Sequence, residues 1–206
     1  MTRDLRICFV GDSLVAGVGD PLCLGWPGRL TARAFAAGQP VTPYNLGVRR
    51  QTSADILARW EEECARRLAE GTDRRVVFSL GVNDTTLEGG RPRVAPEEST
   101  ANLAKMLDGA AGRGWQALVV APPPVADPGQ NLRTARLDER FASLCREAGV
   151  PYVAAHRPLS GNAVWMHEVR VGDGSHPGAA GYEEFAALLA PHWAAWLCLA
   201  EQRRPG

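Results

Sequence analysis

The residues that could do chemistry lie in four short polar clusters spread along the chain. Three clusters follow a short apolar run and the fourth precedes an amphipathic stretch: Gly11-Asp12-Ser13, Asn45-Leu46-Gly47, Gly81-Val82-Asn83-Asp84 and Asp173-Gly174-Ser175-His176-Pro177. Any one such block is common by chance, whereas the whole set in this order is rare. The set therefore predicts an active site assembled from distant parts of the chain.

Ser13 is the candidate nucleophile, because a tight turn after Gly11 can present its hydroxyl at the end of a strand. A free serine hydroxyl is a poor nucleophile and needs a neighbouring base. His176 is the candidate base, since imidazole titrates near neutral pH and can both accept and return a proton. Asp173 stands three residues before His176 and could bond to the other ring nitrogen, fixing the tautomer and stabilising the imidazolium.

Attack on an ester creates a tetrahedral oxyanion, which needs hydrogen-bond donors aimed at the developing charge. The backbone amides of Ser13 and Gly47 and the side-chain amide of Asn83 are the candidate donors. We assign Asp12 and Asp84 to structure instead, as carboxylates that shape their turns.

Each of these residues also has a structural interpretation. Ser13 could simply cap a helix, and Asn83 with the residue after it could form a plain turn. Asp173 could be only a turn former, which would leave a serine-histidine pair whose histidine is oriented by a backbone carbonyl. Three other histidines are rival bases, but none lies in a block that brings it to Ser13: His156, His167 and His192.

Residues near these clusters are candidates for substrate binding: Leu14, Val48, Arg49, Thr85 and Trp165. The neighbouring cations Arg49 and Arg50 could hold a carboxylate or a phosphate of the substrate, although such a pair more often forms a solvated face. Trp165 and Met166 could form an apolar wall for an acyl group or belong to the core.

Short apolar runs alternate with amphipathic stretches, which is typical of strand-helix units around a parallel sheet. The predicted strands are residues 5–10, 41–46, 76–80, 117–121 and 150–154. Helical periodicity marks residues 56–68, 103–111, 137–148 and 182–196, while 14–25, 85–95 and 155–172 read as long loops. A capping box is expected at Thr52–Asp55, and Pro96 and Pro177 are expected at helix starts.

This pattern predicts an α/β fold, a three-layer α/β/α sandwich with a doubly wound five-stranded parallel sheet of order 2-1-3-4-5. In such sheets ligands collect beyond the carboxyl ends of the strands, near the point where the strand order reverses. The first and third strands flank that point, so Ser13 and Asn83 are expected to face each other there.

Composition narrows the class of protein further. The 206 residues, 45% of them hydrophobic, suit one domain spanning 1–206, and the balance of 23 basic against 23 acidic residues gives no reason to expect a nucleic-acid partner. The five cysteines are scattered, with no CxxC pair. The apolar run at 5–10 is too short for a secretory signal and no run reaches membrane-spanning length, so we expect a cytoplasmic protein without a membrane span.

The four blocks together resemble those of the SGNH hydrolase superfamily, the GDSL-type lipases, esterases and acylhydrolases, and most closely its small single-domain bacterial type. The resemblance covers nearly the whole chain. It implies a flavodoxin-like sandwich and an acyl-enzyme mechanism without metal or other cofactor, acting on a small-molecule ester. It also implies the roles assigned above: Ser13, Asp173 and His176 as catalytic residues and Ser13, Gly47 and Asn83 as oxyanion donors.

The resemblance leaves the substrate open. A thioesterase or a carbohydrate acetylesterase would use the same site, and a non-catalytic module that binds a glycan or an acylated ligand is the alternative from another class. Dinucleotide, phosphate-loop and metalloprotease motifs are absent: Gly17-Val18-Gly19 lacks a third glycine, and His167-Glu168 has no second histidine at the required spacing. The sequence does not indicate an oligomeric state.

Overall fold

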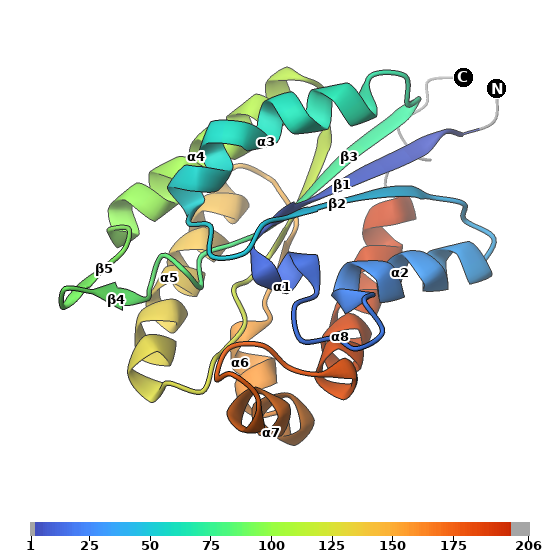
Figure 1. The fold of residues 1–206 in the computed structure, drawn as a ribbon. Coiled ribbons are helices and arrows are strands. Elements are labelled where there is room, and N and C mark those ends of the chain that lie inside the picture. The colour runs from blue at the N-terminus through green and yellow to red at the C-terminus, as the bar shows by residue number, and fades with distance from the viewer. Residues whose placement is uncertain (1–2, 199–206) are drawn as a thin grey trace.

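The computed structural model describes residues 3–198, which form a central parallel sheet covered on both faces by helices (Figure 1). The sheet has the order β2-β1-β3-β6-β7. Its strands are β1 (Leu5–Gly11), β2 (Thr42–Gly47), β3 (Asp73–Ser79), β6 (Gln116–Val120) and β7 (Tyr152–Val153). This is the predicted order of five strands, so the expected doubly wound α/β fold is confirmed.

The middle strand β1 explains why the sheet is covered on both sides. Ile7 and Phe9 point into one hydrophobic cluster and Cys8 and Val10 into the other, and all four side chains are fully buried. A strand buried on both faces is continuously apolar rather than alternating, as parallel strands usually are. β1 therefore lies between β2 and β3, paired in parallel with each.

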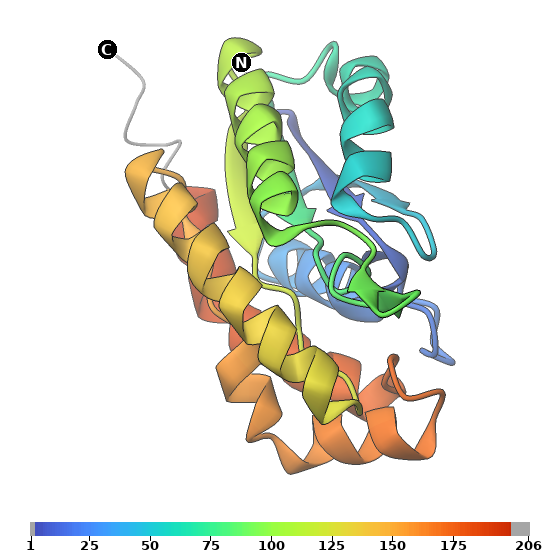
Figure 2. The ribbon, with the colours of Figure 1, turned by 90° about the vertical axis from the view of Figure 1, so that its left-hand side faces the viewer.

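The helices form the two outer layers (Figures 1 and 2). One face carries α3 (Ser53–Leu68), α4 (Pro96–Gly112) and α5 (Pro128–Glu147). The other carries α2 (Gly25–Ala36), α7 (Ala163–Val171) and α8 (Ala179–Cys198), with α6 (His156–Ser160) beside them. The expected capping box starts α3: Thr52 and Asp55 bond each other's backbone amides. Within residues 3–198, no helix has the length and apolar character needed to cross a bilayer.

Several segments expected to be irregular contain short elements. The first predicted loop holds α1 (Ser13–Ala16), the second a hairpin of β4 (Leu87–Glu88) and β5 (Arg91–Pro92), and the third α6 and α7. The loop prediction was wrong in these places because an element of two to nine residues is too short to show a clear period. Pro96 opens α4 as expected, whereas Pro177 lies two residues before α8 begins.

Candidate active site

Ser13 lies where β1 turns sharply into α1. Asp12 caps that short helix, its Oδ1 accepting the Leu14 amide proton at 2.9 Å. Gly11 allows the turn, since a Cβ there would lie 2.1 Å from the Ser79 carbonyl oxygen on β3. A side chain at position 11 would therefore force the two central strands apart. The turn leaves Ser13 itself mostly buried, yet on the wall of a surface cavity.

His176 and Asp173 meet Ser13 from the loop before α8. The His176 Nε2 atom lies 2.7 Å from Ser13 Oγ, and its Nδ1 atom lies 2.7 Å from Asp173 Oδ2. The other carboxylate oxygen of Asp173 accepts the amide protons of Ser175 and His176, both at 2.9 Å. The structure thus brings together three residues that the sequence places up to 163 positions apart.

Hydrogen bonds set the charge of Asp173. Partial burial by itself opposes ionisation, but the bonds from the His176 ring and from two backbone amides outweigh it and lower the pKa of Asp173 to about 2. An ionised Asp173 accepts the Nδ1 proton of neutral His176, which leaves Nε2 free to take the proton of the Ser13 hydroxyl. The three side chains can therefore act as nucleophile, base and orienting carboxylate.

The predicted oxyanion donors separate into two groups. Ser13 and Asn83 line the cavity, the Asn83 amide donating to the Gln51 carbonyl at 3.0 Å and to Asp12 Oδ2 at 3.3 Å. Gly47 is not among the lining residues, and its amide donates to Asn45 Oδ1 at 3.0 Å.

Gly47 packs closely against the backbone of α1. A Cβ there would lie 2.2 Å from the Ala16 amide nitrogen and 2.7 Å from the Asp12 carbonyl oxygen. A side chain at Gly47 would therefore collide with the backbone of α1 and displace the helix that carries Ser13.

A turn that follows Gly47 reaches the cavity. Gln51 donates its amide proton to the Val48 carbonyl at 3.4 Å, and Arg50 within the turn has a φ of 65°, the left-handed region that glycine usually occupies. Arg49 and Arg50 both line the cavity. Sequence reasoning missed the backbone of Arg50 as part of the site, because an arginine carries no signal for a left-handed turn.

The cavity beside Ser13 has a volume of about 300 Å³. It is lined by residues from five regions of the chain: Asp12, Ser13 and Leu14; Arg49 and Arg50; Val82, Asn83, Thr86, Glu88 and Arg93; Gln130; Ser175 and His176. Of the five predicted substrate-binding residues, the structure brings Leu14 and Arg49 to it. Gln130 could not be found from sequence, because it comes from the start of α5, far from every polar cluster.

The other three predicted substrate-binding residues lie elsewhere. Trp165 is fully buried, donates its indole N–H to the Pro124 carbonyl at 3.0 Å and packs on aromatic rings of α8. Thr85 is buried, with its hydroxyl donating to the Val82 carbonyl at 2.8 Å. Val48 is 40% exposed and is not among the lining residues. Trp165 therefore belongs to the core, which was the alternative interpretation of its position.

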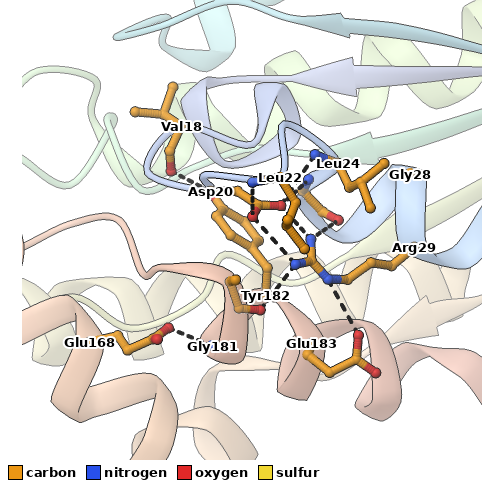
Figure 3. Close-up of polar contacts among 12 residues, drawn as sticks. Val18, Asp20, Leu22, Leu24, Gly28, Arg29, Glu168, Gly181, Tyr182 and Glu183 are labelled. Carbon is orange, nitrogen blue, oxygen red and sulfur yellow. Dashed lines mark hydrogen bonds and ion pairs between the residues drawn. The ribbon is translucent and has the colours of Figure 1, made fainter.

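A buried ion pair supports the loop that follows α1 (Figure 3). Asp20 accepts a hydrogen bond from the Arg29 guanidinium on α2 and another, at 2.8 Å, from the Gly25 amide. Arg29 also donates to the Ala179 carbonyl at 3.1 Å, at the first turn of α8. Both side chains are almost completely buried. This pair therefore connects the nucleophile side of the site to the helix that follows His176.

Two further contacts bring the same loop against the histidine segment. The Tyr182 hydroxyl on α8 donates to the Val18 carbonyl at 2.8 Å (Figure 3). A Cβ at Gly19 would lie 2.6 Å from the Pro177 carbonyl oxygen and 3.2 Å from the His176 Cβ, so the loop backbone packs directly on His176. The position of the base thus depends on the loop between α1 and α2.

The two aspartates assigned to structure have structural contacts. Asp12 caps α1, as described above, and Asp84 accepts the Ser53 amide proton at the start of α3 at 2.7 Å. Burial raises the pKa of Asp12 to about 7, with the neighbouring Asp84 charge adding to the effect and the Leu14 amide opposing it. Asp12 therefore lies beside Ser13 in a buried environment that disfavours the ionised carboxylate.

The rival histidines stay away from Ser13. His156 is buried, and desolvation lowers its pKa, whereas His167 and His192 are exposed. None of the three lines the cavity. Among residues 3–198, no group of three or more histidine, cysteine or carboxylate side chains is arranged to hold a metal ion.

Comparison with known proteins places the chain among ester hydrolases. The GDSL-like Lipase/Acylhydrolase family matches residues 9–184. An arylesterase of Vibrio mimicus is 34% identical over 102 residues, an alignment that covers 50% of this chain and 46% of that protein. Esterase TesA of Pseudomonas aeruginosa is 30% identical over 148 residues, covering 71% of this chain and 69% of the esterase.

The fold has solved counterparts as well. The crystal structure of a lipase/acylhydrolase from Enterococcus faecalis superposes with a TM-score of 0.73 at 22% identity, covering 91% of this chain and 94% of the other. At that identity the superposition establishes the shared fold, whereas the sequence matches carry the family.

Proposed function

The chain belongs to the GDSL-like Lipase/Acylhydrolase family, and from that premise we propose that it hydrolyses carboxylic esters through an acyl intermediate on Ser13. One observation carries the proposal: the unbroken chain of contacts from Ser13 Oγ through the His176 ring to Asp173, with both contacts 2.7 Å long. The relatives named as esterases support the reaction class.

In the acylation step, Ser13 Oγ attacks the ester carbonyl carbon while its proton passes to His176 Nε2. The tetrahedral intermediate then collapses, the bond to the alkoxide breaks, and the alkoxide leaves as an alcohol with the proton from His176. Asp173 keeps its negative charge throughout and stabilises the transient imidazolium.

Deacylation repeats the sequence with water. A water molecule attacks the acyl carbon and gives its proton to His176 Nε2, and collapse of the second tetrahedral intermediate breaks the bond to Ser13 Oγ. The serine takes back the proton from His176 and the carboxylic acid is released. His176 thus acts as base and acid once in each half-reaction, and no cofactor enters the scheme.

Three donors stabilise the oxyanion in this proposal. The Ser13 amide and the Asn83 side chain are two of them, as the sequence suggests. The Arg50 amide is the third, in place of the Gly47 amide, because Arg50 lines the cavity and Gly47 does not. Loss of one such donor typically lowers turnover by about 10² to 10³.

A fluorophosphonate probe tests the proposal, because it forms a covalent bond only with an activated serine. We expect stoichiometric labelling of the folded protein, detected as a mass increase, with none in Ser13→Ala. Hydrolysis of an activated ester such as 4-nitrophenyl butyrate should disappear in the same variant. A folded wild-type protein that neither reacts with the probe nor cleaves any of a panel of esters and thioesters would instead be a binding module.

A further inference from the structure

We propose that the physiological substrate carries an anionic group, a carboxylate or a phosphate, which Arg49 and Arg50 bind next to Ser13. This inference rests on the proposed ester hydrolysis and names the class of ester. Three observations carry it: the charge of the cavity wall, the pairing of its arginines and the conformation of the turn that holds two of them.

The cavity wall carries an excess of positive charge. Three of its lining residues are arginines, Arg49, Arg50 and Arg93, and two are acidic, Glu88 and Asp12. Asp12 is only 2% exposed and its oxygens accept hydrogen bonds from Leu14 and Asn83, so it forms no ion pair with these arginines. The lining residues therefore carry a net positive charge.

Of the three arginines that line the cavity, only Arg93 forms an ion pair with a carboxylate in the described part of the chain. Arg93 forms an ion pair with Glu88 at 3.2 Å and donates to the Arg50 carbonyl at 2.9 Å, so it connects the β4–β5 hairpin to the turn. Arg49 and Arg50 are exposed and form no ion pair within residues 3–198. Arg66 on α3, by contrast, is paired with Glu62. Two arginines without an ion-pair partner among residues 3–198 therefore line the cavity beside Ser13.

The left-handed backbone conformation of Arg50 is unusual for an exposed residue with a side chain. A left-handed backbone costs a residue with a side chain about 1 kcal/mol relative to glycine, yet an arginine occupies it at φ 65°. The turn is fixed on both sides, by the bond from Gln51 to Val48 and by the bond from Arg93 to the Arg50 carbonyl. Strained backbone maintained at the wall of an active-site cavity is typical of a functional position.

Guanidinium chemistry defines the ligand. Arginine presents donors in a planar fork that matches the paired oxygens of a carboxylate or a phosphate. A neutral acyl chain or an unsubstituted sugar gains nothing from two such groups, which would lose hydration without a partner. An ester whose acyl or alcohol part ends in an oxyanion gains both pairings.

Matched pairs of activated esters test the inference. On the acyl side, 4-nitrophenyl hemiglutarate is compared with its neutral methyl ester. On the alcohol side, 4-acetoxybenzoate and 4-acetoxyphenyl phosphate are each compared with their neutral methyl esters. Each pair differs in charge at nearly constant shape, so the ratio of kcat/KM within a pair isolates the contribution of the anion.

We expect wild type to favour the anionic member of at least one pair about fivefold to tenfold, as two partly solvated ion pairs allow. The ratio should fall to near one in Arg49→Gln/Arg50→Gly, in which glycine keeps the turn, and in Arg49→Gln/Arg50→Asn, since asparagine also tolerates the left-handed region. It should also fall as salt is raised to 1 M. Arg66→Gln, which removes an exposed charge away from the cavity, should leave the ratio unchanged.

A ratio near one for every pair in wild type overturns the inference while Ser13-dependent turnover of the neutral esters keeps the proposed function intact. A preference that survives in both double variants, or that Arg66→Gln removes equally, also overturns it. Absence of Ser13-dependent turnover and of probe labelling would instead overturn the proposed function, and this inference with it.

Discussion

Asp12 and Asp173 each lie next to a proposed catalytic side chain, but they differ in burial and their pKa values shift in opposite directions. Asp12, beside Ser13, is 2% exposed, and burial raises its pKa to about 7. The Asp173 side chain, beside His176, is 53% exposed, and its bonds to the histidine ring and two amides lower its pKa to about 2. The comparison indicates that burial in the core positions Ser13, whereas hydrogen bonds to a charged carboxylate position His176.

The elements behind the two sides explain this difference. Ser13 follows a central strand that is buried on both faces, so the core itself fixes its position. His176 lies on a loop that gains its order from Asp173 and from the loop between α1 and α2. Substitutions near Ser13 and substitutions near His176 should therefore change stability and turnover in different ways.

Removal of either Ser13 or His176 should have the largest effect on turnover. The two variants should lose similar amounts of activity. Ser13→Ala and His176→Ala should each lower kcat by about 10⁴ or more, because residues of one catalytic unit fail together. Steady-state kinetics on 4-nitrophenyl butyrate measure the effect, with circular dichroism to show that each variant is folded. A loss below about 100-fold in either variant would require another nucleophile or base.

The Asp173→Asn variant tests whether the charged contact is essential on the base side. We expect kcat to fall by about 10² to 10⁴, since an amide cannot hold the imidazolium or select the same tautomer. Probe labelling should slow in parallel while the melting temperature changes little, because Asp173 is largely exposed. A loss smaller than about tenfold would mean that Ser13 and His176 work as a pair.

Arg29 tests whether the buried ion pair positions the base. In Arg29→Met the carboxylate of Asp20 stays buried without its cation, which typically costs about 3 to 5 kcal/mol of stability. We also expect kcat to fall by roughly tenfold with little change in KM, because a small displacement of His176 weakens proton transfer more than substrate binding. The double variant Asp20→Asn/Arg29→Met, which leaves no buried charge, is the matched control.

If positioning is the role of the pair, the double variant should regain stability but not kcat. Urea unfolding and steady-state kinetics on both proteins separate the two effects. Full recovery of kcat together with stability would assign Asp20 and Arg29 to stability alone.

The last prediction concerns stability rather than turnover, namely the pH dependence that Asp12 contributes. The folded protein holds a proton on Asp12 up to about pH 7, whereas the unfolded chain loses it near the ordinary pKa of 3.8. Between these values the folded state binds more protons, so this group makes stability fall as pH rises from 4 to 7. Asp173 acts in the opposite sense, adding stability above about pH 4 that is lost as pH falls towards 2.

Asp12→Asn should therefore gain stability relative to wild type at pH 7.5 and lose this advantage at pH 4.5. Urea unfolding at both values measures the difference, and asparagine retains the ability to cap α1. Equal differences at the two pH values would show that Asp12 does not titrate in this range.

Sequence patterns predicted the central features because each has a local physical signal. The five strands could be found from buried runs such as Ile7–Val10, and the strand order from the alternation of strands and helices. Thr52 caps α3 through the capping box that its spacing from Asp55 predicts. The approach of His176 to Ser13 could be inferred because both residues lie at the same edge of a parallel sheet.

The features that sequence patterns missed depend on tertiary contacts. Gly47 looks like an oxyanion donor, yet only the closeness of the α1 backbone reveals that it is needed for packing. Arg50 adopts a glycine-like backbone that only the surrounding turn and Arg93 maintain. Trp165 had two interpretations, and only the packing of α7 against α8 shows that its position is in the core.

The 163 residues between Ser13 and His176 have a consequence during synthesis. During synthesis Ser13 emerges long before His176, because the chain is made from its N-terminus. Until the two residues meet, Ser13 lacks its proposed base and should react poorly with esters. The onset of hydrolysis during refolding should therefore report when this long-range contact forms, and a fluorogenic ester can follow it in real time.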